Sequence, residues 1–163
     1  MGTFVSTEHE GAVALVTIDN PPMNALSAAL LEELEAELDR LDGDAVADLW
    51  HAGSGITDSG SDDGARLTWW PDEAPMRANH RALCERYRQG GYGSADFVIE
   101  QHVPMGPNHA FAHLRWTLRR SDGALLQHFH TGYQLMRTAN GPRVLLAVAH
   151  QENLSEMTRH AAE

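Results

Sequence analysis

Three runs of alternating apolar and polar residues, joined by Asp122-Gly123 and Asn140-Gly141, constrain the fold of this chain more than any other feature. Asp-Gly and Asn-Gly between alternating runs are the strongest short-range signal for β-hairpins, because both residues tolerate the positive φ angles that two-residue turns require. The stretch from Asp96 to Glu152 is therefore predicted to form a meandering antiparallel sheet.

A two-residue turn also fixes which residues lie opposite each other, and successive residues of a strand point to opposite faces of the sheet. The first turn predicts four pairs on one face: Trp116 with Phe129, Leu114 with Thr131, Ala112 with Tyr133, and Ala110 with Leu135. The second turn continues this mostly apolar face: Leu135 with Leu146, Tyr133 with Val148, Thr131 with His150, and Phe129 with Glu152. The other face is more polar: Phe111, His113, Arg115, His128, His130, Gln134, Ala147, Ala149 and Gln151. A one-residue bulge at either turn would exchange the two faces.

The composition fits one soluble domain with a hydrophobic core, since 42% of the 163 residues are hydrophobic and 21% are charged. The net charge of −11 disfavours nucleic acid and anionic membranes as partners, because binding phosphates requires a basic surface. No apolar run approaches the roughly 20 residues of a membrane span. The start of the chain also lacks the basic and then apolar pattern of a secretory signal, so we expect a cytoplasmic protein.

Lysine is absent from the sequence, and Cys84 is its only cysteine. The absence of lysine excludes Schiff-base aldolases, pyridoxal-phosphate enzymes and phosphate-loop nucleotide hydrolases, because each depends on a lysine amine. A single cysteine forms no internal disulfide and no multi-thiolate metal site. The glycines at 53, 55, 90 and 91 lack the spacing of a dinucleotide-binding motif. We therefore expect a protein that uses no cofactor.

The N-terminal part is predicted to contain one strand and one helix. The strand spans 12–18 and ends at Asn20-Pro21-Pro22, because proline removes a backbone donor. In the following helix Leu30, Leu34, Leu38 and Leu41 recur at helical spacing, and Gly43 is placed to end it. The acidic residues between these leucines are predicted to form its solvated face.

The segment 13–27, with the sequence VALVTIDNPPMNALS, resembles the opening of the crotonase family of enoyl-CoA hydratases and isomerases. With the helix after it, the resemblance extends over residues 8–42, about a quarter of the chain, and includes none of the family's catalytic residues. It implies an acyl-CoA protein as one functional alternative. It also suggests an N-terminal unit, residues 1–43, packed onto a main domain of residues 44–163.

Asp44 is predicted to cap a short second helix that runs through Val46, Leu49 and Trp50. Residues 53–64 are rich in glycine, serine and aspartate, which is typical of a loop. A calcium site is the alternative for this segment. The ordered acidic spacing and terminal glutamate of helix-loop-helix calcium sites are missing, which favours a solvated loop.

A short strand over 67–70 and a third helix starting near Pro75 are predicted next. Residues with helical spacing form one face of this helix: Met76, His80, Leu83, Cys84 and Tyr87. Arginine and glutamate occupy most of the other positions. This amphipathic pattern predicts a helix that packs against the sheet.

Three sequences, YRQGGY at 87–92, LRWTLRR at 114–120 and GYQLMRTANGPRV at 132–144, resemble the SnoaL-like, nuclear-transport-factor-2-like superfamily. The resemblance extends over about residues 44–153. It implies an α+β fold in which helices pack in the concave face of a curved antiparallel sheet, a cone-shaped, cystatin-like roll. The superfamily includes ketosteroid isomerase, scytalone dehydratase, polyketide cyclases and domains without catalysis, so the fold alone does not select a function.

In such a fold one pocket lies between the sheet and the helices. Six residues are predicted to bind a ligand there: His80, Tyr87, Trp116, Phe129, Thr131 and Val148. His150 is the candidate proton carrier, with Glu152 on the same strand face and Tyr133 as a donor to a developing oxyanion. The alternative is structural, because a histidine on an apolar strand is usually a core residue.

A metal site is the second possibility for the histidines. His128 and His130 share one strand face, and His113 lies near them across the hairpin. The pattern places no carboxylate beside them, and Arg115 opposite His130 would repel a cation. We therefore expect no metal.

Three functions stay open. The first is a cofactor-free lyase, isomerase or cyclase acting on a hydrophobic carbonyl compound, and the second is a non-catalytic module that binds a hydrophobic small molecule or dimerises. The third is the acyl-CoA protein of the crotonase resemblance. A homodimer is expected through the outer sheet face, where Phe111, Ala147 and Ala149 mix with histidine and arginine.

Overall fold

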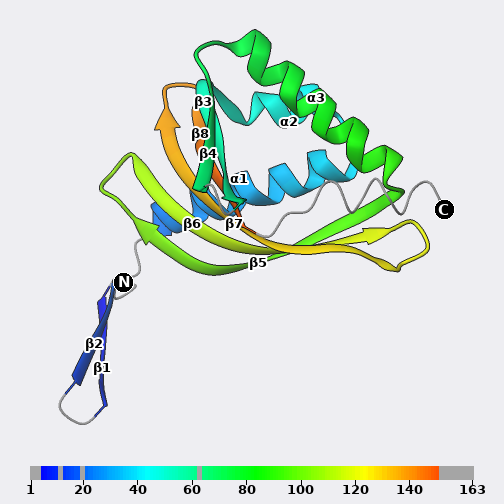
Figure 1. Ribbon diagram of the computed structural model, residues 1–163. Helices are drawn as coiled ribbons and strands as arrows, with labels where there is room; N and C mark the ends of the chain where they lie inside the picture. Colours follow the sequence, from blue (N-terminus) through cyan, green and yellow to red (C-terminus); the bar gives the residue numbers. More distant parts are fainter. Residues whose placement is uncertain (1–4, 11–12, 19–20, 62–63, 151–163) are drawn as a thin grey trace.

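The computed structural model describes residues 5–10, 13–18, 21–61 and 64–150, with side chains for 28–58 and 64–150. These residues form three helices and two sheets (Figure 1). The elements in chain order are β1 (Val5–Glu10), β2 (Val13–Ile18), α1 (Pro21–Asp39), α2 (Gly43–Asp48), β3 (Trp50–Ser61), β4 (Gly64–Trp70), α3 (Glu73–Gln89), β5 (Tyr92–Pro104), β6 (His109–Arg120), β7 (Leu125–Thr138) and β8 (Gly141–His150).

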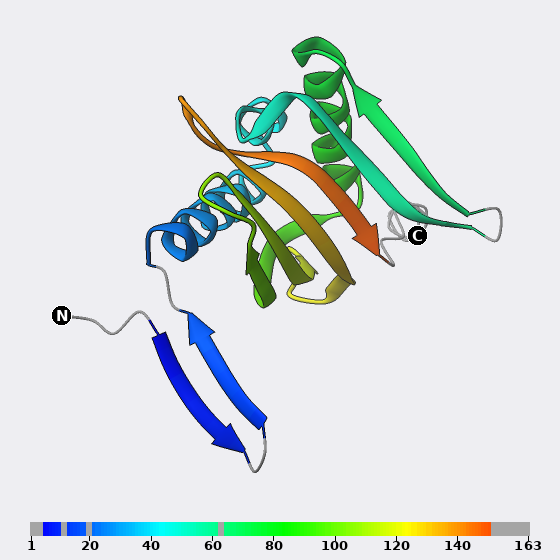
Figure 2. The same ribbon diagram turned by 90° about the vertical axis from the view of Figure 1, so that its left-hand side faces the viewer.

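Six strands form one curved sheet in the order β4-β3-β8-β7-β6-β5, while β1 and β2 pair only with each other among the described strands. Strands β5 to β8 form the predicted antiparallel meander, and β3 joins it by pairing in parallel with β8. Figures 1 and 2 show α1, α2 and α3 on the concave side of this sheet. The predicted α+β fold, with helices in the concave face of a curved sheet, is confirmed.

The first predicted hairpin is confirmed in its register. Gly123 has φ of 85° in the turn, and its N–H donates to the carbonyl of Arg120 over 2.9 Å. Trp116 lies opposite Phe129, and the other three predicted pairs also form. Alternate residues of β6 are consequently in the core, with exposed fractions between 0 and 3%: Ala110, Ala112, Leu114, Trp116 and Leu118.

The second predicted hairpin forms, but its register differs from the prediction. Thr138 pairs with Gly141, so the turn lies one residue earlier than expected, and Leu145 has no partner between Val144 and Leu146. The extra residue is a β-bulge, which reverses the faces of the strand beyond it. The predicted partners of Leu135, Tyr133 and Thr131 were therefore wrong. Their actual partners are Val144 for Leu135, Ala147 for Tyr133 and Ala149 for Thr131.

The N-terminal strand and helix form close to their predicted positions, as β2 and α1. Helix α1 begins at Pro21, because proline fits the first helical turn, where its missing N–H is not needed. It ends at Asp39, earlier than the predicted stop at Gly43, and Leu41 adopts the positive φ of 52°. Leu30 and Leu34 are buried in the hydrophobic core.

Helix α2 is capped by Asp42 and not by Asp44 as predicted. The Asp42 Oδ1 atom accepts hydrogen bonds from the backbone N–H groups of Asp44 at 3.0 Å and Ala45 at 3.1 Å. The Asp44 carboxylate instead pairs with Arg81 of α3 at 2.7 Å. Trp50, predicted at the end of this helix, is the first residue of β3.

In the segment 53–64, which was predicted as a loop, residues 53–61 form most of β3 and Gly64 begins β4. Gly55 illustrates why a glycine-rich sequence is extended here: a Cβ at this position would lie 2.8 Å from the Trp69 ring. The same residue pairs with Trp69 on one side and with Leu146 on the other. Pairing along both edges outweighs the weak strand propensity of glycine and serine.

Helix α3 follows the prediction, with Pro75 in its first turn. Met76, His80, Cys84 and Tyr87 are buried along one face. The carboxylates of Glu73, Asp44 and Asp48 surround Arg77, which ties α3 to α2. At the same contact the two backbones touch, because a Cβ on Gly43 would lie 2.5 Å from the Cα of Arg81.

This contact predicts that Gly43→Ala destabilises the protein. The added methyl meets backbone atoms of α3, which cannot rotate away, so the free energy of unfolding should fall by about 2 kcal/mol. Gly53→Ala is the matched control, since its nearest neighbours would lie 3.7 Å from the new Cβ. Urea unfolding of both variants measures the difference, and equal stability of the two would contradict the close contact.

Candidate functional site

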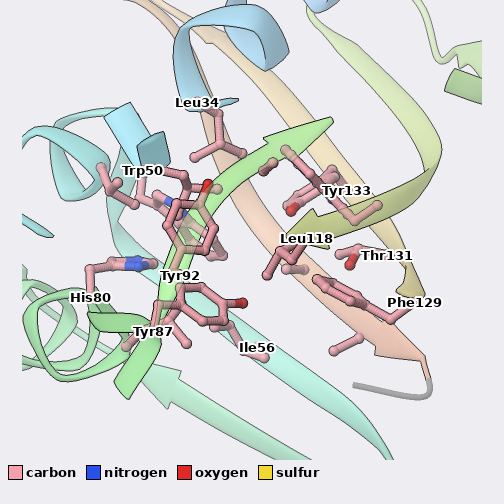
Figure 3. A pocket seen from close by; sticks show the side chains of 17 residues that line it. Leu34, Trp50, Ile56, His80, Tyr87, Tyr92, Leu118, Phe129, Thr131 and Tyr133 are labelled. Carbon is pink, nitrogen blue, oxygen red and sulfur yellow. The ribbon is translucent and has the colours of Figure 1, made fainter. Parts of the chain in front are cut away.

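One cavity of about 70 Å³ lies between the concave sheet face and all three helices (Figure 3). Helices α1, α2 and α3 contribute Leu34, Val46 and His80 among others, and the sheet contributes most of the aromatic rings. The aromatic lining residues are Trp50, Tyr87, Tyr92, Trp116, Phe129 and Tyr133. A mainly apolar cavity with a few polar groups is the usual form of a small-molecule site.

The volume limits what the cavity holds in this conformation. One water molecule needs a cavity volume of roughly 10–15 Å³, and an engineered cavity that binds benzene has a volume of about 150 Å³. A cavity of about 70 Å³ therefore takes a few waters, or the small apolar part of a ligand. A complete six-membered ring requires lining side chains to move.

Most of the residues predicted to bind a ligand or take part in catalysis meet at this cavity. They are His80, Tyr87, Trp116, Phe129, Thr131 and Tyr133. Tyr133 and Thr131 come from β7 and Trp116 from β6, as the predicted first register requires. Figure 3 shows His80 and Trp50 at one end of the cavity and Phe129, Thr131 and Tyr133 at the other.

Val148 and His150 do not line the cavity, contrary to the predicted face of β8. The bulge at Leu145 turns them to the outer face, where His150 pairs with His130 and its ring lies 6.3 Å from that of His113. Ala147 and Ala149 line the cavity in their place, and both were predicted on the outer face. Glu152 lies outside the described residues. The functional roles predicted for Val148, His150 and Glu152 stay predictions.

His80 is the most unusual residue of the cavity wall. Its side chain is 1% exposed, and neither ring nitrogen has a hydrogen-bond partner within the described part of the chain. Its ring centre lies 4.5 Å from that of Trp50 and 6.2 Å from that of Trp70. Burial lowers the pKa of His80 to about 4, so its imidazole is neutral near pH 7.

Two tryptophans that line the cavity also have a buried nitrogen without a hydrogen-bond partner among the described residues. The Nε1 atoms of Trp50 and Trp116 are buried and have no hydrogen-bond partner within the ranges that the structure describes. The hydroxyl of Ser54, on β3, is in the same situation. Since more than nine in ten buried polar groups are normally paired, the cluster of Trp50 and His80 distinguishes this end of the cavity.

The hydroxyl of Tyr92 forms a hydrogen bond that connects α1 to β5. It donates a hydrogen bond to the Oδ1 of Asp39 at 2.7 Å, and the same oxygen accepts the N–H of Ala95 at 2.9 Å. Burial and this bond raise the pKa of Tyr92, which keeps the phenol protonated. The pair fixes the end of α1 to β5 beside the cavity.

The described part of the cavity wall carries no charged carboxylate or guanidinium group and no reactive thiolate. Among the described residues, no Asp, Glu or Arg lines it. Burial raises the pKa of the Cys84 thiol to about 11, so this side chain is protonated and a poor nucleophile. The apolar spacing of three and four residues in α3 identified His80 and Tyr87 as buried residues. It gave no indication that the described cavity wall lacks charged side chains.

The outer sheet face carries a separate cluster around Glu100 of β5. This carboxylate contacts Arg115 at 3.0 Å, and His113 and His130 at 3.5 Å each. The sequence pattern placed no carboxylate beside these histidines, and that expectation was wrong because a register shift in β5 brings Glu100 to them. Within the described segments, no group of three or more His, Cys, Asp or Glu has an arrangement suited to a metal ion.

None of the helices in the described ranges is long and apolar enough to cross a membrane.

A family model described as an NTF2-like protein (DUF6841) matches residues 26–152. No curated protein matches the chain. The match begins inside the segment that resembles crotonases and does not test that resemblance.

Several solved structures have the same fold at low sequence identity. A domain with a cystatin-like fold from Nostoc punctiforme has a TM-score of 0.64 and 9% identity, covering 82% of this chain and 80% of that chain. A ketosteroid isomerase-like protein from Erwinia carotovora atroseptica has a TM-score of 0.56 and 14% identity, covering 80% and 96%. A proposed dehydratase from Streptomyces avermitilis has a TM-score of 0.60 and 11% identity, covering 82% and 99%.

The neutral state of His80 predicts a specific pH dependence of stability. Its pKa is about 4 in the folded protein and 6.5 ordinarily, so between these values the unfolded chain binds a proton that the folded protein does not. The contribution of neutral His80 to the free energy of unfolding is therefore fully present above pH 6.5. It is lost as the pH decreases towards 4, which lowers the free energy of unfolding by about 3 kcal/mol at most.

Urea unfolding at pH 7 and pH 5 tests this, with His80→Leu losing the extra dependence and His109→Gln retaining it. The same pH dependence in the wild type and in His80→Leu would show that His80 is not the group responsible.

Proposed function

Because the chain belongs to the NTF2-like protein family DUF6841, we propose that it binds a small, mainly apolar molecule in the cavity between its helices and its sheet. The observation that carries this proposal is the cavity itself, which is lined by aromatic and aliphatic side chains and has a few polar groups at its ends. Cores without a binding function are normally packed with few voids larger than a water molecule.

Three alanines support a cavity that serves a ligand. Ala95 from β5 and Ala147 and Ala149 from β8 face the cavity, where larger side chains would fill it. Ala147 and Ala149 reach this position only through the bulge at Leu145. A bulge next to a site is a frequent way of directing side chains towards it.

A cofactor-free isomerase, lyase or cyclase acting on a hydrophobic carbonyl compound is the second candidate. It is supported by the position of His80 and Tyr133 in the cavity and by the resemblance to the ketosteroid isomerase-like protein and the proposed dehydratase. Proton abstraction needs a base with a pKa near the working pH, and His80 has a pKa of about 4. Among the described residues no carboxylate lines the cavity, so binding without catalysis ranks first.

An acyl-CoA protein ranks last. Coenzyme A carries phosphates, which are bound most strongly by arginine. The described lining of the cavity contains no arginine. Only the resemblance of residues 8–42 to crotonases supports this alternative.

Filling the cavity tests the proposed function. Ala147→Leu places three extra carbon atoms in a cavity of about 70 Å³, so small apolar probes such as benzene and toluene should bind at least tenfold more weakly. Ligand-observed NMR with the purified protein measures this, and circular dichroism confirms that the fold is retained.

Ala124→Leu is the matched control, since it makes the same change at an exposed turn residue and should leave binding unchanged. Absence of binding to the wild type, or equal binding to both variants, would rule out this site.

We also propose that the outer sheet face forms a homodimer, with Phe111, His113 and Val148 in the contact. Exposed apolar side chains support this: Val98 and Val103 are about half exposed on the neighbouring strand. His113→Glu adds a charge beside Glu100, which already lies 3.5 Å from His113, and should convert a dimer into monomers.

Light scattering after gel filtration measures the mass, and Ala124→Glu in the exposed turn is the control. A wild type that is already monomeric would refute the interface.

A further inference from the structure

Two polar side chains without hydrogen-bond partners among the described residues lie side by side at one end of the cavity. His80 from α3 and Trp50 from β3 have ring centres 4.5 Å apart, and both have nitrogens without a partner among the described residues. Both are nearly inaccessible to solvent, with 1% and 6% exposure. An unpaired buried polar group costs about 1–3 kcal/mol, so this pair is a considerable cost to the folded protein.

Within the described ranges, the residues around this pair do not supply the missing partners. The ring centre of Trp70 lies 6.2 Å from that of His80. The other buried residues of α3 are Met76, Cys84 and Tyr87. The three nitrogens without a partner among the described residues, the Nε1 of Trp50 and both ring nitrogens of His80, belong to side chains that line the cavity. A molecule in the cavity is therefore well placed to supply the partner.

The chemistry of the two groups limits what that partner is. The indole of Trp50 only donates a hydrogen bond, whereas neutral His80 donates from one ring nitrogen and accepts at the other. A carbonyl oxygen accepts from both, and a hydroxyl accepts from Trp50 while donating to His80. A carboxylate would need a cation to offset its desolvation, and the described cavity wall provides none.

We infer that His80 and Trp50 form the recognition point for one uncharged oxygen, a ketone or an alcohol, on a ligand that is otherwise apolar. This inference rests on the proposed binding function and specifies its ligand class. The opposite end of the cavity, with Phe129, Thr131 and Tyr133, then holds the apolar part of the ligand (Figure 3).

Four probes of similar size test the inference: methylcyclohexane, cyclohexanone, cyclohexanol and cyclohexanecarboxylate. The wild type should bind the ketone or the alcohol at least tenfold more tightly than methylcyclohexane, and should not bind the carboxylate. Which of the two is preferred distinguishes a carbonyl from a hydroxyl ligand. Titration followed by NMR gives the four dissociation constants.

His80→Leu should remove the preference for oxygen while methylcyclohexane binds within about twofold of the wild-type affinity. His80→Gln keeps a donor and an acceptor and should retain part of the preference. The matched control is His109→Gln, which lies away from the cavity and should behave as the wild type.

A measurement on the wild-type protein avoids reliance on variants that fold poorly. The indole N–H resonance of Trp50, assigned with Trp50→Phe, should move downfield with cyclohexanone and stay in place with methylcyclohexane. The exposed Trp69 provides the internal reference.

Different failures are distinguishable. If methylcyclohexane binds as tightly as the oxygenated probes, the inference is wrong and the proposed function stands, with a buried water then satisfying His80. If none of the four probes binds, the proposed function fails and the inference fails with it. Tight binding of the carboxylate alone would also overturn the inference.

Discussion

The bulge at Leu145 is the constraint on which the interior of this protein depends. One unpaired residue in β8 decides which side chains of the last strand face the helices. It brings Ala147 and Ala149 inward and sends Val148 and His150 outward. Without this shift two larger side chains would point into the space beneath α3, and the cavity would be filled. The binding site is thus a consequence of strand register as much as of the residues around it.

The cavity joins two properties that normally oppose stability, an unfilled volume and unpaired polar groups. Voids reduce packing interactions, and buried nitrogens without partners lose the hydrogen bonds that water gives them in the unfolded chain. The contacts between α2 and α3 add stability: the Arg77 ion pairs with Asp44 and Asp48 and the backbone contact at Gly43 hold the helix in place. The helix that carries His80 is therefore anchored to α2 along its N-terminal half.

Much of the fold was predictable, because turns and periodicity act locally. The pairing of Trp116 with Phe129 follows from one turn and strict alternation, and the burial of His80 follows from helical spacing. Strand β3 was not predictable from its glycines and serines, since its extended form depends on partners distant in the chain. The bulge at Leu145 has no recognisable sequence signal. For that reason the cavity was predicted with the correct residues from β6 and β7 and with the wrong ones from β8.

The parallel pairing of β3 with β8 has a consequence for how the protein folds. Ile56 pairs with Ala147, about ninety positions later in the chain, whereas β5 to β8 are joined by short turns. Closing so long a loop is slow compared with forming hairpins, because its entropy is lost before its contacts are gained. The meander is then expected to form first and the β3–β4 hairpin to dock last. The cavity wall is completed only in that final step, so its apolar lining is exposed to other chains for as long as folding remains unfinished.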